Sequence, residues 1–205
     1  MIVVGLTGSV GTGKSTVAGF FKELGAYIID WDVLAREVVR PHWKAWEEIV
    51  QYFGEDVLND DLTLNRQKLA DIVFGDKEKV TRLNQIVHPE VFIEDQRITS
   101  GIKNSDTDAL VIKDIPLLVE DARHVLIEKI IVVSATEETQ LRRLAERGMR
   151  REDAMNRIKA QLPLEEKLKF ADFVVDNNGS IAETKKQVEQ IYHLLKQGGA
   201  NGNQG

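Results

Sequence analysis

The sequence predicts an α/β protein whose core is a parallel β-sheet. Short apolar runs alternate along the chain with longer segments in which apolar residues recur at helical spacing. Such alternation is typical of parallel strands joined by crossover helices that cover both faces of the sheet. The chain has 205 residues, of which 42% are hydrophobic and 29% are charged, so it is long enough to bury one substantial core.

The first part of the chain supplies two strands and two helices. Residues 2–6 form an apolar run, and the segment 15–24 carries apolar residues at helical spacing until a glycine favours its end. A second apolar run, 26–30, predicts the next strand. Residues 33–40 then fit a helix that Pro41 interrupts.

A long helical insertion separates the second expected strand from the third. The pattern over 43–97 is almost wholly helical, apart from a polar loop at 54–65. Its apolar residues lie on two separate faces, formed by Trp46, Ile49, Val50 and Phe53 and by Leu83, Ile86 and Val87. We therefore expect a helical subdomain mounted on the sheet.

The second half of the chain returns to alternating strands and helices. Its strands are expected at 109–114, 129–135 and 172–177. Its helices are expected at 137–146, at 150–170 with a break at Pro163, and at 180–196. Ser180 and Glu183 have the spacing of a capping box, in which two side chains satisfy the first amides of a helix.

These elements predict a single folded domain over residues 1–196. Its core would comprise 1–40 and 105–196, and the helical insertion would comprise 41–104. The last residues, 197–205, contain only one core-forming side chain, an alanine. We predict a flexible tail there.

A glycine-rich stretch directly after the first strand is the most specific motif in the sequence. Residues 8–15, GSVGTGKS, fit the pattern G-x-x-x-x-G-K-[ST] between an expected strand and an expected helix. Glycines let consecutive backbone N–H groups converge, and with the positive end of the helix dipole these groups can hold a polyphosphate. The alternative is a glycine-rich turn that binds nothing, and the complete motif in this context argues against it.

The motif predicts a nucleoside triphosphate accompanied by Mg²⁺. Lys14 would reach the β- and γ-phosphates, the Ser15 hydroxyl would ligate Mg²⁺, and Thr16 would lie beside the α-phosphate. The residues expected to bind the nucleotide in this loop are Gly8, Gly11, Thr12, Gly13, Lys14, Ser15 and Thr16.

Acidic residues follow two of the expected strands, and the carboxyl ends of parallel strands line a binding crevice. Of Asp30 and Asp32, one could accept the proton of an attacking hydroxyl and the other could order the waters around Mg²⁺. Alternatively, both could be solvated acids that cap the next helix. Asp114 ends the third strand, where it could contact Mg²⁺ through water or only shape the turn before Pro116.

Six arginines lie between residues 142 and 157. Acidic residues are interspersed among them, so a solvated helix face is one interpretation. A nucleic-acid patch is weakly supported, because aromatic residues do not interleave with the arginines. The functional interpretation is a mobile lid at about 148–165, hinged at Gly148, whose arginines close over the phosphates.

The composition excludes several classes of partner. The formal net charge of -6 does not favour nucleic acid or an anionic membrane surface. No apolar run is long enough to cross a bilayer, and the N-terminus lacks an export signal. The sequence has no cysteine, which excludes disulfides and thiolate metal sites. We expect a cytoplasmic protein with small-molecule partners, and neither nucleic acid nor a membrane.

Five segments in a fixed order carry a resemblance to a known family. They are GLTGSVGTGKSTVA, IIDWDVLAREVV, VHPEV, IPLLVE and RIKAQLPLEEKLKFADFVVDNNGS. Together they resemble the dephospho-CoA kinase family over nearly the whole folded chain. The resemblance implies a P-loop kinase with a helical substrate-binding insertion and a helical lid. It also implies transfer of the γ-phosphoryl group of ATP to the ribose 3′-hydroxyl of dephospho-CoA, with Mg²⁺, in the last step of CoA synthesis. We expect a monomer or a weak homo-oligomer.

The resemblance assigns roles to residues on the acceptor side. Asp32 matches the family's catalytic base, and Arg36 lies in the acceptor-facing segment. His88 matches a substrate-site histidine, although a lone histidine in a helical segment is by itself more often structural. Pro116 and Leu117 belong to the P-L-L-x-E segment and are expected to contact the substrate.

On the nucleotide side, the resemblance points to the arginines and to the last strand. Arg143, Arg147 and Arg157 match lid-side positions near the nucleotide, and Arg143 is expected to act with Lys14 in catalysis. Asn178 and its neighbours lie near the expected adenine-binding turn.

Two segments depart from the family pattern. Trp31 replaces the small residue that is usual between the two aspartates, which puts the local packing at the acceptor site in question. RPHWKAWEE, beginning at Arg40, is bulkier than the usual Pro-Gly stretch and could alter how the insertion grips the pantetheine arm. Neither departure affects the phosphate loop.

Two other functions remain open from the residues alone. The first is a different small-molecule kinase on the same scaffold, such as a nucleoside monophosphate kinase or a shikimate kinase. The second is a regulatory GTP-binding switch. A switch requires a guanine-selecting N-K-x-D segment after a late strand, and the sequence contains none.

Overall fold

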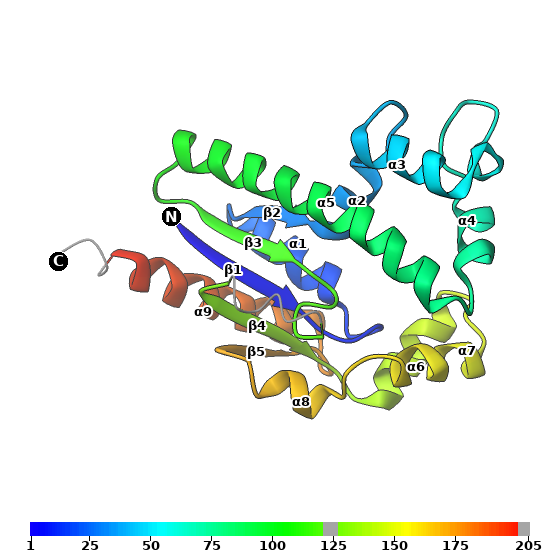
Figure 1. Ribbon diagram of the computed structural model, residues 1–205. Helices are drawn as coiled ribbons and strands as arrows, with labels where there is room; N and C mark the ends of the chain where they lie inside the picture. Colours follow the sequence, from blue (N-terminus) through cyan, green and yellow to red (C-terminus); the bar gives the residue numbers. More distant parts are fainter. Residues whose placement is uncertain (121–126, 201–205) are drawn as a thin grey trace. The chain divides into compact units, whose positions relative to one another are not determined.

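The computed structural model describes residues 1–120 and 127–200, and Figure 1 shows the order of the elements. The strands are β1 (Ile2–Thr7), β2 (Tyr27–Asp30), β3 (Leu110–Asp114), β4 (Lys129–Ser134) and β5 (Phe173–Asp176). The helices are α1 (Lys14–Glu23), α2 (Trp31–Glu37), α3 (Lys44–Phe53), the 3₁₀ turn η1 (Glu55–Val57), α4 (Arg66–Val73), α5 (Lys77–Ser105), α6 (Glu137–Glu146), α7 (Arg151–Lys159), α8 (Leu164–Leu168) and α9 (Ile181–Ala200). All five strands lie within a few residues of the predicted runs.

The described strands form one sheet in the order β2-β3-β1-β4-β5, and every neighbouring pair is parallel. Leu6 of β1 and Asp30 of β2 both stand in register with Asp114 of β3. The carboxyl ends of these strands therefore share one edge of the sheet. The strand order reverses at β1, and this topological switch point is where parallel α/β sheets bind their ligands. The predicted α/β class is confirmed.

The residues form two compact units, which are described separately. The first comprises 1–30 and 102–205 and contains the sheet. The second comprises 31–101 and contains helices α2 to α4 and most of α5. The second unit begins at Trp31, ten residues before the start predicted for the insertion.

Helices α1 and α9 cover one face of the sheet. Val4 and Leu6 of β1 point into a buried cluster there, and successive strand residues point to opposite faces. Phe21 and Val188 bring α1 and α9 into the same cluster. On the other face, an added Cβ at Gly5 would lie 2.7 Å from the Leu118 side chain, so β1 also packs closely there. The strand that carries the phosphate loop is thus buried on both faces.

The unit formed by residues 31–101 contains a buried hydrogen bond between two side chains. The Trp31 indole N–H donates a hydrogen bond to Asp95 Oδ1 of α5 over 3.1 Å, and both side chains are buried. The indole N–H of Trp31, the bulky residue that departs from the family pattern, therefore has its hydrogen-bond acceptor inside this unit. It occupies the first position of α2, immediately before Asp32.

The C-terminal helix begins as the sequence predicts but ends later. Ser180 N–H donates to Glu183 Oε2 over 2.7 Å, and Glu183 N–H donates back to Ser180 Oγ over 3.3 Å, so the capping box is confirmed. Residues 197–200, which were predicted to begin a flexible tail, continue α9. Residues 201–205 lie outside the described part of the chain. No helix in the described part is long and apolar enough to span a membrane.

Candidate functional site

The glycine-rich loop lies between the end of β1 and the start of α1. Thr12 closes it through its N–H and its hydroxyl, which both donate to the Ser9 carbonyl over 3.2 and 2.8 Å. The first amides to bond within the helix are those of Thr16 and Val17, which donate to the Gly13 carbonyl over 3.0 and 3.3 Å. The earlier amides of this helix end have no partner within the helix, which makes it a potential anion site.

Two glycines of the loop are required by its shape. Gly11 and Gly13 have φ angles of 80° and 87°, in the left-handed region that disfavours L side chains. A Cβ at Gly11 would lie 3.0 Å from the backbone oxygen of Gln140 in α6, and a Cβ at Gly13 would collide with the Asn177 side-chain nitrogen. The motif glycines thus reflect backbone conformation and close packing together.

Arg143 of α6 is committed to the backbone of the loop. Its Nη1 donates to the Thr12 carbonyl over 3.0 Å and to the Gly11 carbonyl over 3.5 Å, and its Nη2 donates to the Asn177 carbonyl over 2.7 Å. Burial lowers the pKa of its guanidinium, and the positive charge of the neighbouring Arg142 lowers that pKa further. Arg143 stays charged, since a guanidinium does not lose its proton in proteins.

Lys14, the first residue of α1, forms an ion pair with Asp114 at the end of β3. The Asp114 side chain is 6% exposed and that of Lys14 is 17% exposed, so the pair is largely shielded from solvent. Nearby, Thr7 Oγ1 donates to the Pro116 carbonyl over 3.1 Å and ties the end of β1 to the turn after β3. The structure therefore brings the predicted Lys14, Asp114 and Pro116 to one edge of the sheet.

The oxygen ligands at this edge fit a magnesium ion that arrives with a polyphosphate. Ser15 is exposed in the first turn of α1, next to Lys14, and Asp114 supplies one carboxylate. Among residues 1–120 and 127–200, no group of three or more His, Cys, Asp or Glu side chains could hold a metal by itself. Mg²⁺ commonly takes only one or two protein ligands and completes its shell with phosphate oxygens and water.

The segment predicted as the lid contacts the loop through a hydrogen bond and through an apolar cluster that contains Val10 of the loop and Ala154 of α7. Gln161 Oε1, between α7 and α8, accepts a hydrogen bond from the Val10 N–H over 2.8 Å. Arg147 and Arg157 are exposed, and Gly148 joins α6 to α7. Of the predicted lid-side residues, the structure thus brings only Arg143 into hydrogen-bonding contact with the loop.

A buried ion pair joins this segment to the residues after β3. Lys167 of α8 is fully buried, and its Nζ lies 2.6 Å from Glu120 Oε1, the last residue of IPLLVE. The Leu162 N–H also donates to Glu120 Oε1, over 3.3 Å. Leu117, predicted to contact substrate, is 40% exposed. The glutamate of this motif is therefore structural, and the leucine is accessible.

Other predicted site residues lie on helices of the 31–101 unit or on the turn after β5. Asp32 and Arg36 are exposed on α2, and His88 is exposed on α5. Asn178 is exposed after β5, where its Oδ1 accepts from the Thr136 N–H over 2.7 Å. Asp30 is the last residue of β2.

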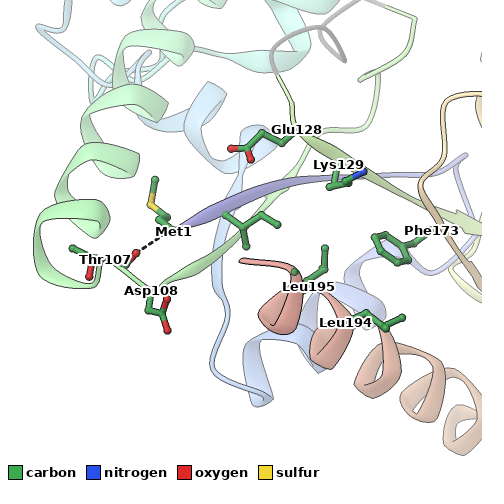
Figure 2. Close-up of a pocket in the computed structure, with 10 residues that line it drawn as sticks. Met1, Thr107, Asp108, Glu128, Lys129, Phe173, Leu194 and Leu195 are labelled. Carbon is green, nitrogen blue, oxygen red and sulfur yellow. Dashed lines mark hydrogen bonds between the residues drawn. The ribbon is translucent and has the colours of Figure 1, made fainter. Parts of the chain in front are cut away.

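A hollow lies at the opposite edge of the sheet from the glycine-rich loop, where β1, β4 and β5 begin. This cavity has a volume of about 720 Å³. Its lining includes Met1, Asp108, Lys129, Phe173 and Leu194, which Figure 2 shows. It lies at the amino ends of the strands, whereas parallel sheets bind ligands at the carboxyl ends. We do not assign it to the nucleotide.

Three polar residues that hold the loop were missed by the sequence analysis as individual residues. They are Asn177, Thr184 and Gln161. Gln161 and Asn177 lie within the quoted family segment RIKAQLPLEEKLKFADFVVDNNGS, and Thr184 lies on the inward side of the amphipathic last helix. A polar residue on an otherwise apolar helix face was the available signal for Thr184.

Comparisons with known proteins agree with this geometry. The family model described as dephospho-CoA kinase matches residues 2–183. A dephospho-CoA kinase of Aquifex aeolicus is 46% identical over 192 residues, covering 94% of this chain and 96% of the relative. One of Carboxydothermus hydrogenoformans is 45% identical over 195 residues, covering 95% and 94%.

Solved structures show the same likeness. TT1252 from Thermus thermophilus superimposes with a TM-score of 0.79 at 32% identity, covering 95% of this chain and 97% of that one. The dephospho-CoA kinase from Campylobacter jejuni gives a TM-score of 0.73 at 27% identity, covering 96% and 98%. A shikimate kinase from Acinetobacter baumannii gives 0.51 at 16% identity, covering 97% and 94%, a likeness of fold alone.

Proposed function

This chain belongs to the dephospho-CoA kinase family, and from that premise we propose which of its residues perform the phosphoryl transfer. The enzyme is an ATP-dependent kinase that phosphorylates dephospho-CoA. The observation that carries the residue assignment is the loop of Gly8–Ser15, whose first helix amides have no partner within the helix and lie next to Lys14. The shikimate kinase-like alternative rests on fold alone, and no N-K-x-D segment supports a GTP switch.

We propose that the loop amides and Lys14 hold the ATP triphosphate. Lys14 would exchange Asp114 for the β- and γ-phosphates when ATP binds, because the polyphosphate carries more negative charge than one carboxylate. Ser15 and Asp114 would hold Mg²⁺, the latter through water, and the ion would neutralise charge on the phosphates. The half-buried Thr16 would complete the site beside the α-phosphate.

We propose that Asp32 accepts the proton of the ribose 3′-hydroxyl. The new bond forms between this oxygen and the γ-phosphorus, the bond from that phosphorus to the bridging oxygen breaks, and ADP leaves. The transition state is loose, so alignment and charge neutralisation contribute more to the rate than the base does. The exposed Asp32 carboxylate on α2 supports this role. We propose Arg36, His88, Pro116 and Leu117 as acceptor-binding residues.

We propose that residues 148–165 form a lid over the nucleotide. The bond from the Val10 N–H to Gln161 supports it, since it already links this segment to the loop. Arg147 and Arg157 are exposed and would neutralise phosphate charge on closure. Asn178 remains the candidate for the adenine-binding turn. The substrates, ATP and dephospho-CoA, are supplied in the cytoplasm, where we place a monomer or weak homo-oligomer.

Acceptor selectivity tests the function directly. Release of ADP should be measured in a coupled assay with dephospho-CoA, shikimate and nucleoside monophosphates as acceptors, each with ATP and with GTP. We expect turnover with ATP and dephospho-CoA only. Turnover restricted to shikimate or to a nucleoside monophosphate would overturn the assignment.

Arg143 was predicted to be catalytic, and its bonds to three backbone carbonyls support a positioning role instead. We expect Arg143→Lys to lower kcat/KM for ATP about tenfold or more, because an ammonium group cannot reproduce the fixed fork of a guanidinium. Steady-state kinetics with ATP as the varied substrate would measure this. The control is Arg142→Lys, an exposed arginine that pairs with Glu146 one turn later. Equal losses in both variants would contradict the proposal.

A further inference from the structure

A buried polar network supports the phosphate loop from the turn after β5. We infer that Asn177 and Thr184 are positioning residues, which orient the Gly13 amide for binding the phosphates of ATP. The inference rests on the proposed role of this loop as the ATP site. Its structural basis lies wholly within the unit that contains the sheet.

Thr184 of α9 fixes the orientation of the Asn177 side chain. Thr184 Oγ1 donates to Asn177 Oδ1 over 2.8 Å, and the two residues are 0% and 3% exposed. An amide oxygen can only accept hydrogen bonds, so this bond leaves the amide nitrogen to face the loop. Asn177 Nδ2 donates to the Thr12 carbonyl over 2.7 Å.

The direction of the Thr12 carbonyl determines the direction of the next amide. The carbonyl of Thr12 and the N–H of Gly13 belong to one planar trans peptide group, so they point in opposite directions. Because Asn177 and Arg143 both hold this carbonyl, the Gly13 N–H faces away from them. A series of amides held in this way is what creates a phosphate-binding concavity.

The packing at Gly13 supports the same role. Its φ of 87° lies in the left-handed region that favours glycine, and the Asn177 amide occupies the space of a side chain. The network and the motif glycine are therefore in direct contact. A mutation of Asn177 or Thr184, which lie far from the loop in the sequence, should therefore alter the conformation of the loop.

The simpler role for such residues would be to fix the turn between β5 and α9. Gln187, one turn after Thr184 on α9, does this without touching the loop. Its Nε2 donates to the Asp176 carbonyl over 2.8 Å, and its Oε1 accepts from the Asp176 N–H over 2.9 Å. Gln187→Ala is thus a matched control that loses two bonds to the same turn.

Hydrogen–deuterium exchange of the nucleotide-free protein tests the structural step. Thr184→Val removes the hydroxyl at nearly constant volume, and Thr184→Ser retains it. We expect amides of the peptide spanning residues 8–16 to exchange about tenfold faster in Thr184→Val, with Thr184→Ser and Gln187→Ala near wild type. Unchanged exchange in Thr184→Val, or equal acceleration in Gln187→Ala, would overturn the inference.

Kinetics of Asn177→Ala test the functional step. We expect KM for ATP to rise about tenfold, while KM for dephospho-CoA stays within about twofold. A calorimetric Kd for ADP should weaken in parallel. Equal increases of both KM values would indicate general disruption and refute the positioning role. Absence of dephospho-CoA phosphorylation in the wild type would refute the proposed function instead, and would leave the exchange result unaffected.

Discussion

Replacement of Lys14 by alanine is expected to abolish detectable turnover, a loss in kcat of about 10³-fold or more. The ammonium group would lie between the β- and γ-phosphates, where negative charge shifts as the terminal phosphoryl group leaves. Alanine removes this charge compensation, which neither the loop amides nor Mg²⁺ can supply at the same position. Initial rates of ADP formation at saturating ATP and dephospho-CoA would measure the loss.

The variant must be separated from a folding defect, because Lys14 also pairs with Asp114. Thermal unfolding followed by circular dichroism should show a folded protein with a cooperative transition. Lys22→Ala is the matched control, since Lys22 is an exposed lysine in the last turn of the same helix. A Lys14→Ala enzyme that retains a tenth of wild-type kcat would refute the assignment.

Asp32→Asn is expected to lower kcat by about 10²-fold or more and to leave ATP affinity nearly unchanged. Asparagine has nearly the same size as aspartate, but its amide cannot accept a proton at neutral pH. The residue is exposed on α2, so its replacement should cost little stability. Single-turnover rates at saturating substrates, with a calorimetric Kd for ADP, would separate chemistry from nucleotide binding.

Glu37→Gln provides the control for charge on the same helix. Glu37 lies at the other end of α2 and pairs with the exposed Arg40. We expect this variant to keep wild-type kcat. If Asp32→Asn also kept near-wild-type kcat, Asp32 would not be the base. If both variants lost kcat to the same extent, the loss would result from removing a negative charge from α2 and not from preventing proton transfer.

Most of the fold could be predicted because it depends on local patterns. The apolar runs of β1 and β3 and the capping box of Ser180 and Glu183 are readable within a few residues of sequence. The phosphate loop is equally local, since eight consecutive residues specify its turns and its lysine. The end of α9 lies four residues beyond the predicted end at 196, because the glycines at 198 and 199 disfavour a helix by their local propensity.

The residues that hold the loop could not be singled out in this way. Thr12 and Asn177 are 165 positions apart and meet only because β4 and β5 follow β1 in the sheet order. Asn177 and Asn178 are identical side chains in adjacent positions, yet the first is buried against the loop and the second is exposed. No propensity distinguishes them, because the direction of each side chain depends on where the strand ends.

The sequence by itself predicted a triphosphate-binding loop after the first strand, and it pointed to the acceptor through motifs spread along its length. Short-range spacing suffices for that, since a loop of consecutive amides is built from neighbouring residues. Only the tertiary structure decided that the Arg143 guanidinium donates hydrogen bonds to backbone carbonyls and that the Trp31 indole N–H donates to Asp95. Both outcomes depend on hydrogen bonds between distant segments, whose partners are chosen by packing.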